Sequence, residues 1–210
     1  MIADDICYFG YGSLVNRETR PADELAAPAR LRGWQRVWGH RVAPRDNRPP
    51  ACSLSIEPNV PPGLLSDPDA SALEPDERGI DGVVVRLPLE ALPVLDRRES
   101  GYDRLTLPAT DFDLPEGLGI DEVHVYRSKA ENRTAPSVSQ PILRSYVDCV
   151  MAGYLRVFGE GGLDAFLLST RGWEGTIEDD RAAPRYPRAV EVPGALRSRF
   201  DRLVSARRGD

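Results

Sequence analysis

Residues 6–14 read Ile-Cys-Tyr-Phe-Gly-Tyr-Gly-Ser-Leu. The apolar and aromatic residues that begin this stretch are typical of a β-strand, and the change to Gly-Ser is typical of a strand that ends in a tight turn. Because Gly10 and Gly12 carry no side chain, another molecule can approach the backbone closely here. Consecutive amides in such a turn can form a nest for a carboxylate or an oxyanion. A turn without any binding role is the structural alternative.

The composition is that of an ordinary globular domain. The 210 residues are 41% hydrophobic and 29% charged, which fits one domain, or one domain with an extension. The net charge is −6 and no basic block stands apart from acids, which argues against nucleic acid as a partner. Lys129 is the only lysine, and this dominance of arginine is typical of GC-rich coding and favours a bacterial source. The sequence has no run of 18 apolar residues and no signal peptide after Met1, so we expect a cytoplasmic protein that has no membrane partner.

The cysteines and histidines do not form a recognisable site. Cys7, Cys52 and Cys149 are odd in number and far apart, so they predict neither a disulfide framework nor a CxxC metal site. The two histidines, His40 and His124, have no metal-ligand spacing with the scattered acids. A cysteine–histidine pair could supply a nucleophile and a base, but no Gly-rich elbow surrounds Cys7 or Cys52. We therefore predict no metal.

The pattern of apolar residues predicts more strands than helices before residue 130. We predict strands at 6–11, 30–43 (long and bent, with Gly33 and Gly39 as kink or bulge sites), 51–57, 79–87, 102–108 and 122–127. We predict a loop with a short helical turn at 16–29, and a surface excursion at 58–78. Strands that follow one another without helices between them indicate an α+β fold with a small mixed or antiparallel sheet that can curl into a barrel.

Helices are predicted mainly in the second half of the chain. The spacing of apolar residues predicts a helix over 141–158 with Ser139 as its N-cap and Gly159 as its end. Shorter helices are predicted at 90–99, where Pro93 fits the first turn, at 162–169 and at 193–204. Residues 170–192 are rich in Arg, Asp and Pro. We divide the chain into a domain at 1–169 and a C-terminal extension at 170–210, and interpret Trp173 and Tyr186 as anchors of the extension in the core.

Glu99 is the candidate for chemistry. At 100° per residue it projects from the same face of the 90–99 helix as Leu92 and Leu95. A carboxylate on a buried face is costly unless it is paired or lies in a pocket, and burial raises its pKa toward the range useful for proton transfer. The alternative is a helix end where Glu99 pairs with Arg98, Arg104 or another arginine.

Taken together, these stretches resemble the γ-glutamylcyclotransferase superfamily, including its glutathione-specific ChaC-like branch. The residues that carry the resemblance are Tyr8-Phe-Gly-Tyr-Gly-Ser-Leu14, Arg30-Leu-Arg-Gly-Trp34, Gly82-Val-Val-Val85, Leu95-Asp-Arg-Arg-Glu99 with Tyr102, Val125-Tyr126 and Ala135-Pro-Ser137. Their order and spacing match over residues 6–166, and the sequence beyond 170 is not covered.

The resemblance implies a barrel-like α+β fold and a cofactor-free cyclisation that releases 5-oxoproline from a small γ-glutamyl peptide, amino acid or amine. It assigns the acid/base role to Glu99 and the binding of the γ-glutamyl group to Tyr11, Gly12, Ser13 and Leu14. Tyr126 matches a tyrosine at the pocket, and Tyr102 lies near the acid in sequence. Asn16 stands where ChaC-like members often carry an aromatic residue, so the substrate branch stays open.

Two readings of this pattern remain. The first is a γ-glutamyl cyclotransferase, in the lyase or acyltransferase sense, with Glu99 as general acid/base. The second is a non-catalytic protein of the same fold that binds a γ-glutamyl metabolite, or that engages a partner through its C-terminal extension. The sequence does not predict the oligomeric state, and a role of residues 170–192 as a lid over the pocket is a further possibility.

Overall fold

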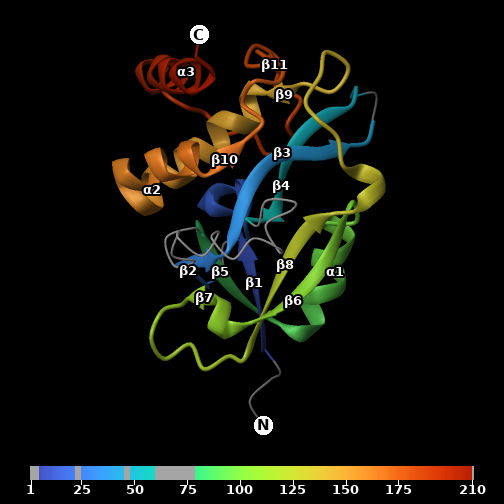
Figure 1. Cartoon of the computed structure of the whole chain (residues 1–210), viewed down its shortest axis with the longest axis vertical. Coiled ribbons are helices and arrows are strands. Elements are labelled where there is room, and N and C mark those ends of the chain that lie inside the picture. Colours follow the sequence, from blue (N-terminus) through green and yellow to red (C-terminus); the bar gives the residue numbers. More distant parts are fainter. Residues whose placement is uncertain (1–4, 22–24, 45–47, 60–78, 210) are drawn as a thin grey trace, which may run out of the picture.

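The computed structural model describes residues 5–21, 25–44, 48–59 and 79–209. The predicted surface excursion at 58–78 lies almost wholly outside these ranges. Eleven strands and three α-helices are described, with short 3₁₀ turns between them (Figure 1). The fold is α+β, as the sequence predicts, and its strands form two curled sheets that are joined into a half-barrel.

The first sheet contains the strand that opens the chain. Its order is β6-β8-β1-β5-β2-β7, with β1 (Asp5–Gly10), β2 (Leu25–Arg32), β5 (Gly79–Pro88), β6 (Tyr102–Pro108), β7 (Phe112–Asp113) and β8 (Glu122–Ser128). β1 is antiparallel to β5 and parallel to β8, so the sheet is mixed. The prediction of a loop over 16–29 is wrong at its end, because Leu25 already belongs to β2 and pairs with Arg86.

The second sheet has the order β10-β3-β4-β9-β11. It contains β3 (Trp34–Val42), β4 (Ala51–Pro58), β9 (Ile142–Leu143), β10 (Thr170–Arg171) and β11 (Ile177–Glu178). The predicted long strand over 30–43 is in fact two strands in different sheets. The chain turns between them at Gly33, whose φ of 74° favours glycine. The predicted irregularity at Gly39 is confirmed, because the register of β3 on β4 shifts between Trp38 and His40.

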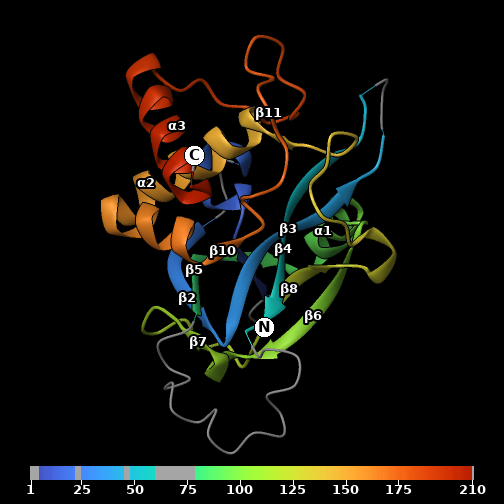
Figure 2. The same cartoon turned by 45° about the horizontal axis from the view of Figure 1, so that its top comes forward.

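The helices lie on two sides of the strands. In both views α2 (Arg144–Leu168) and α3 (Gly194–Arg208) lie beside each other, and α1 (Leu92–Arg98) lies on the opposite side (Figures 1 and 2). The predicted helices at 141–158 and 162–169 follow one another along α2, and the predicted break between them is confirmed, because the backbone of Gly159 is non-helical with a φ of 67°. Ser139 is not the N-cap. Leu143 is, because Ile142 and Leu143 first form β9 between β4 and β11.

Residues after 169 share the core with the rest of the chain. Trp173 is buried and packs edge-on against Trp38, with ring centroids 5.1 Å apart, as predicted for a core anchor. Phe200 and Val204 of α3 are fully buried in the same cluster. β10 and β11 complete the second sheet at its two edges. The division at residue 169 into a domain and an extension stays a prediction. No helix of the described residues is long and apolar enough to span a bilayer.

Candidate active site

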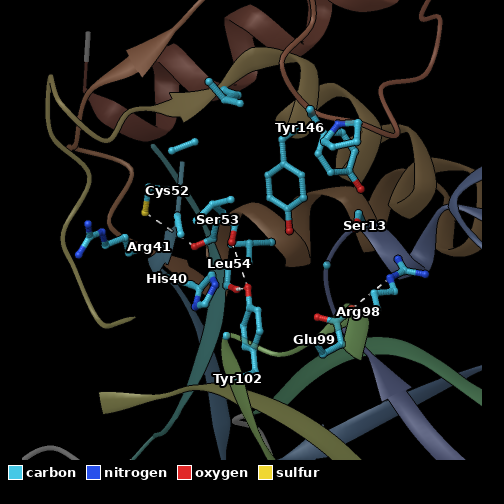
Figure 3. Close-up of a pocket in the computed structure, with 18 of the residues that line it drawn as sticks. Ser13, His40, Arg41, Cys52, Ser53, Leu54, Arg98, Glu99, Tyr102 and Tyr146 are labelled. Atoms are coloured by element: carbon cyan, nitrogen blue, oxygen red, sulfur yellow. Dashed lines mark hydrogen bonds and ion pairs between the residues drawn. The ribbon is translucent and has the colours of Figure 1, made fainter. Parts of the chain in front are cut away.

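A cavity of about 630 Å³ opens between the turn after β1, the end of α1 and the β3–β4 hairpin. All the residues that the sequence proposed for the site line it: Tyr11, Gly12, Ser13, Leu14, Glu99, Tyr102 and Tyr126. Figure 3 shows Ser13, Glu99 and Tyr146 around one open space, with Tyr102 and His40 beside it. The structure thus brings together residues that are about ninety positions apart in the sequence.

The turn after β1 is held close to the helix behind it. Ser13–Val15 form a single 3₁₀ turn, in which the amide of Val15 donates to the carbonyl of Gly12 at 3.0 Å. A Cβ atom on residue 12 would lie 2.9 Å from the hydroxyl oxygen of Tyr146 on α2. Glycine at this position therefore allows the backbone to approach Tyr146, and leaves the turn uncovered toward the cavity.

Glu99 is both a carboxylate in the pocket and the partner of an arginine, the two alternatives that the sequence left open. It is the C-cap of α1, and its side chain is 17% exposed. Burial raises the pKa of its carboxyl, while Arg98 and Arg188 oppose the rise. The Nε of Arg98 lies 3.1 Å from Oε1 of Glu99, so the predicted arginine pairing is present within the pocket, and Arg104 instead pairs with Asp96. A partly buried carboxyl of raised pKa keeps its proton to a higher pH than a free carboxyl, which suits a group that takes up and returns a proton.

Two of the predicted tyrosines have their hydroxyls engaged within the protein. The hydroxyl of Tyr11 donates to the carbonyl of Tyr126 at 2.6 Å, and the hydroxyl of Tyr126 donates to Asp96 at 2.7 Å. Burial raises the pKa of both phenols. These two residues therefore offer the cavity ring faces and backbone rather than free hydroxyls.

Tyr102 contacts residues of β3 and β4 that the sequence did not place at the site. Its hydroxyl lies 3.0 Å from both the carbonyl of Leu54 and the hydroxyl of Ser53. Its ring stacks on His40 with centroids 3.8 Å apart. Burial lowers the pKa of His40 to about 4, so this imidazole is neutral at pH 7. Only the pairing of β3 with β4 brings His40 and Ser53 opposite each other, and the sequence carries no local signal for it.

The C-terminal segment adds further lining residues, Arg185 to Arg188. Tyr186, interpreted from the sequence as a core anchor, packs edge-on against Tyr146 with centroids 4.9 Å apart and also lines the cavity. Its hydroxyl oxygen is buried and has no hydrogen-bond partner among the described residues. Burial raises its pKa to about 12, and the nearby Ser13 side chain opposes the rise. The Arg- and Pro-rich sequence around residue 186 gives no sign of this position.

The alternative of a cysteine nucleophile finds little support. Cys52 lines the cavity, but burial raises the pKa of its thiol to about 12, which keeps it protonated. Its sulfur lies 3.7 Å from the carbonyl of Ser53, whereas Nδ1 of His40 contacts Ser128 at 2.9 Å. Cys7 is buried and does not line the cavity. Within the described ranges, no group of three or more His, Cys, Asp or Glu side chains could hold a metal ion.

Comparison with known proteins identifies the fold that carries this site. No family model and no curated protein matches the sequence. A solved structure named γ-glutamyl cyclotransferase superposes with a TM-score of 0.54 at 18% identity, over 95% of this chain and 99% of its own. This chain has the γ-glutamyl cyclotransferase fold. A second structure, of a human protein described as uncharacterized, superposes with a TM-score of 0.55 at 17% identity, over 94% of this chain and 99% of its own. The γ-glutamyl cyclotransferase fold therefore extends over almost the whole chain, including the segment beyond residue 170 that the sequence resemblance did not cover.

Proposed function

We propose that this protein is a γ-glutamyl cyclotransferase that releases 5-oxoproline from a γ-glutamyl peptide, amino acid or amine. The observation that carries the proposal is the position of Glu99. Its partly buried carboxyl, whose pKa is raised, lines the same cavity as the uncovered turn at Gly12–Leu14. The fold, shared with a solved γ-glutamyl cyclotransferase, supports the same conclusion.

The reaction begins with the substrate's own amine. The α-amine must lose a proton before it attacks the γ-carbonyl carbon, and at pH 7 only about one in ten amines with a pKa near 8 is neutral. The carboxylate of Glu99 accepts that proton. The nitrogen then forms a bond to the γ-carbon and closes a five-membered ring, so that no nucleophile from the protein is needed.

The second half of the reaction breaks the original amide bond. Attack turns the γ-carbonyl oxygen into an oxyanion, which the amides of the turn at Gly12–Leu14 can stabilise. The carbonyl reforms, the C–N bond to the leaving group breaks, and Glu99 gives its proton to the departing nitrogen. The ring nitrogen, which became acidic when the new C–N bond formed, then loses its second proton to the Glu99 carboxylate or to water, and the ring is left with one N–H. The products are 5-oxoproline and a free amine. The turn also holds the substrate in the bent conformer that ring closure requires.

The charges that line the cavity suit a substrate with carboxylates. Glu99 is the only acid among the described lining residues. Five arginines line the cavity as well: Arg41, Arg48, Arg98, Arg185 and Arg188. A γ-glutamyl compound carries an α-carboxylate, and arginine is well suited to bind it. The excess of positive charge also favours the negative charge that develops on the oxyanion.

The test is release of 5-oxoproline by the purified protein. Glutathione, γ-glutamyl amino acids and γ-glutamyl amines are each incubated with it, and the product is quantified by chromatography. Release from at least one class, at a rate proportional to protein concentration, is expected. A folded protein that releases none from any class, yet melts at a higher temperature with these compounds, would instead fit the non-catalytic binding protein.

A further inference from the structure

Arg36 is a fully buried arginine directly behind the turn of the candidate site. It lies on β3 and is 0% exposed. Its Nε donates to the carbonyl of Tyr11 at 2.9 Å, its Nη1 donates to the hydroxyl of Ser169 at 2.6 Å, and its Nη2 donates to the carbonyl of Asp81. Nη2 also donates to the hydroxyl of Tyr154 at 2.5 Å.

This cation has no counterion among the described residues. All four groups that accept its hydrogen bonds are neutral, and its guanidinium carbon lies 4.8 Å from the ring centroid of Tyr154 and 5.4 Å from that of Phe166. The carboxylate of Asp81 pairs with Arg30 instead. An unpaired buried charge is costly to the fold, and such a cost is often found where a charge serves a function.

The carbonyl of Tyr11 accepts a hydrogen bond from Arg36 and lies within reach of one further donor, whose single proton it shares with the carbonyl of Asp81. Besides Arg36, the hydroxyl of Tyr154 on α2 lies 2.8 Å from this oxygen, and 2.7 Å from the carbonyl of Asp81. Tyr154 is fully buried. The described peptide bonds are all trans, and in a trans peptide the C=O and the following N–H point in opposite directions. With the Tyr11 carbonyl directed at Arg36, the N–H of Gly12 points away from Arg36, and Gly12 itself lines the cavity.

We propose that Arg36 and Tyr154 are positioning residues that aim the Gly12 N–H at the γ-carbonyl oxygen of the substrate and strengthen it as a donor. A positive charge at the carbonyl end of a peptide polarises it and makes its N–H more positive. Arg36 also places a positive potential behind the point where the oxyanion develops. This inference rests on the proposed cyclisation, but it assigns roles to two residues that never touch the substrate.

The test compares Tyr154→Phe with Ser169→Ala. Both changes remove one hydroxyl that contacts Arg36, but only Tyr154 also reaches the Tyr11 carbonyl. We expect Tyr154→Phe to lower kcat by about tenfold, the loss of one ordinary hydrogen bond, with KM little changed. Ser169→Ala should keep the kcat of the wild type. Equal kcat in the two variants, or a change in KM alone, would overturn the proposal.

Arg36→Gln and Arg36→Lys separate hydrogen bonding from charge. Glutamine keeps a donor without the charge, and lysine keeps the charge without the planar fork. If the charge acts on the oxyanion, Arg36→Gln lowers kcat on the order of a hundredfold and Arg36→Lys recovers part of the loss. Equal loss in both would show that the charge is not used. If neither folds, Tyr154→Phe still decides the role of the Tyr11 carbonyl.

A second readout does not depend on activity. The ¹⁵N–¹H signal of Gly12 reports the polarisation and orientation of that amide in the 23.2 kDa protein. We expect it to shift in Tyr154→Phe and to stay in place in Ser169→Ala. An unshifted signal in both contradicts the inference even if the enzyme is active. A shifted signal in a protein that releases no 5-oxoproline would show that Tyr154 acts on the Gly12 amide but would contradict the proposed function and, with it, the role in catalysis.

Discussion

Acidification should destabilise this protein most strongly through His40. His40 is 5% exposed, stacks on Tyr102 and is bonded through Nδ1 to Ser128. Burial lowers its pKa from 6.5 to about 4. Between these values the unfolded chain binds a proton at His40 that the folded protein does not. The free energy of unfolding therefore falls as the pH drops from 6.5 toward 4, and is unaffected by this group above 6.5.

The size of the effect follows from the two pKa values. Each pKa unit corresponds to about 1.4 kcal/mol, so lowering the pH from 7 to 4 should remove about 3 kcal/mol of stability through His40 alone. That is a large fraction of the about 5–15 kcal/mol typical of a domain. Glu99 acts in the opposite direction, because a raised carboxyl pKa makes the folded protein bind its proton first. The contribution of His40 must therefore be measured by difference.

His40→Asn isolates that contribution. Asparagine keeps a polar group near Ser128 but does not titrate, so the variant is less stable at pH 7 and loses the His40-linked pH dependence. Urea unfolding at pH 7, 6, 5 and 4 should show the gap between wild type and variant closing by about 3 kcal/mol. His124→Asn is the comparison, since His124 is the only other histidine and is more exposed. Burial and then Arg104 lower the pKa of His124 too, so this variant should lose a smaller part of the same pH dependence than His40→Asn. A gap that stays constant, or a His40 imidazole that titrates near 6.5 by NMR, would refute the reasoning.

Three further changes test other parts of the structure. Gly82→Ala should lower the free energy of unfolding by about 1–3 kcal/mol or prevent folding, because the added Cβ would lie 2.5 Å from the Gly10 carbonyl oxygen. Gly161→Ala is the matched control: its Cβ would meet no atom within 4 Å, so this change should raise the melting temperature slightly. Tyr186→Phe should raise KM severalfold but leave the melting temperature equal or higher, since it removes a buried hydroxyl without a partner in the described structure; a lower melting temperature would contradict this. The acid limb of the kcat/KM profile should lie above pH 4.5, the ordinary value for glutamate, because burial raises the pKa of Glu99; a limb at or below 4.5 would exclude it as the base.

Local patterns predicted most of the secondary structure. The strands at 79–87 and 102–108 carry strong strand patterns, and the structure has them at Gly79–Pro88 and Tyr102–Pro108. Residues 25–29 were missed because alanine-rich segments favour strands weakly, and here the pairing with β5 decides the conformation. Ser139 resembles an N-cap by its type, but the pairing of Ile142 with β4 and β11 delays the start of the helix.

The candidate site was predictable where its residues lie in short motifs. Glu99 and the turn at Gly12 stand out by helical geometry and by their glycine-rich context. Arg36, His40 and Tyr186 do not, because their positions depend on contacts between distant parts of the chain. Arg36 shows the difficulty well. It shares a face of the strand with Trp34 and Trp38, because side chains alternate with a period of two, but only the full fold shows that this face encloses it behind Tyr11.

The most direct test of the proposed chemistry is the rate of 5-oxoproline release by Glu99→Gln beside Glu90→Gln. Glutamine keeps the size of the side chain but cannot transfer the proton, whereas Glu90 is an exposed acid just before the same helix and serves as the matched control. If Glu99 is the acid/base, Glu99→Gln lowers kcat about 10²–10⁴-fold while its melting temperature is kept, and Glu90→Gln has the rate of the wild type. A Glu99→Gln protein that releases 5-oxoproline as fast as the wild type would contradict the mechanism.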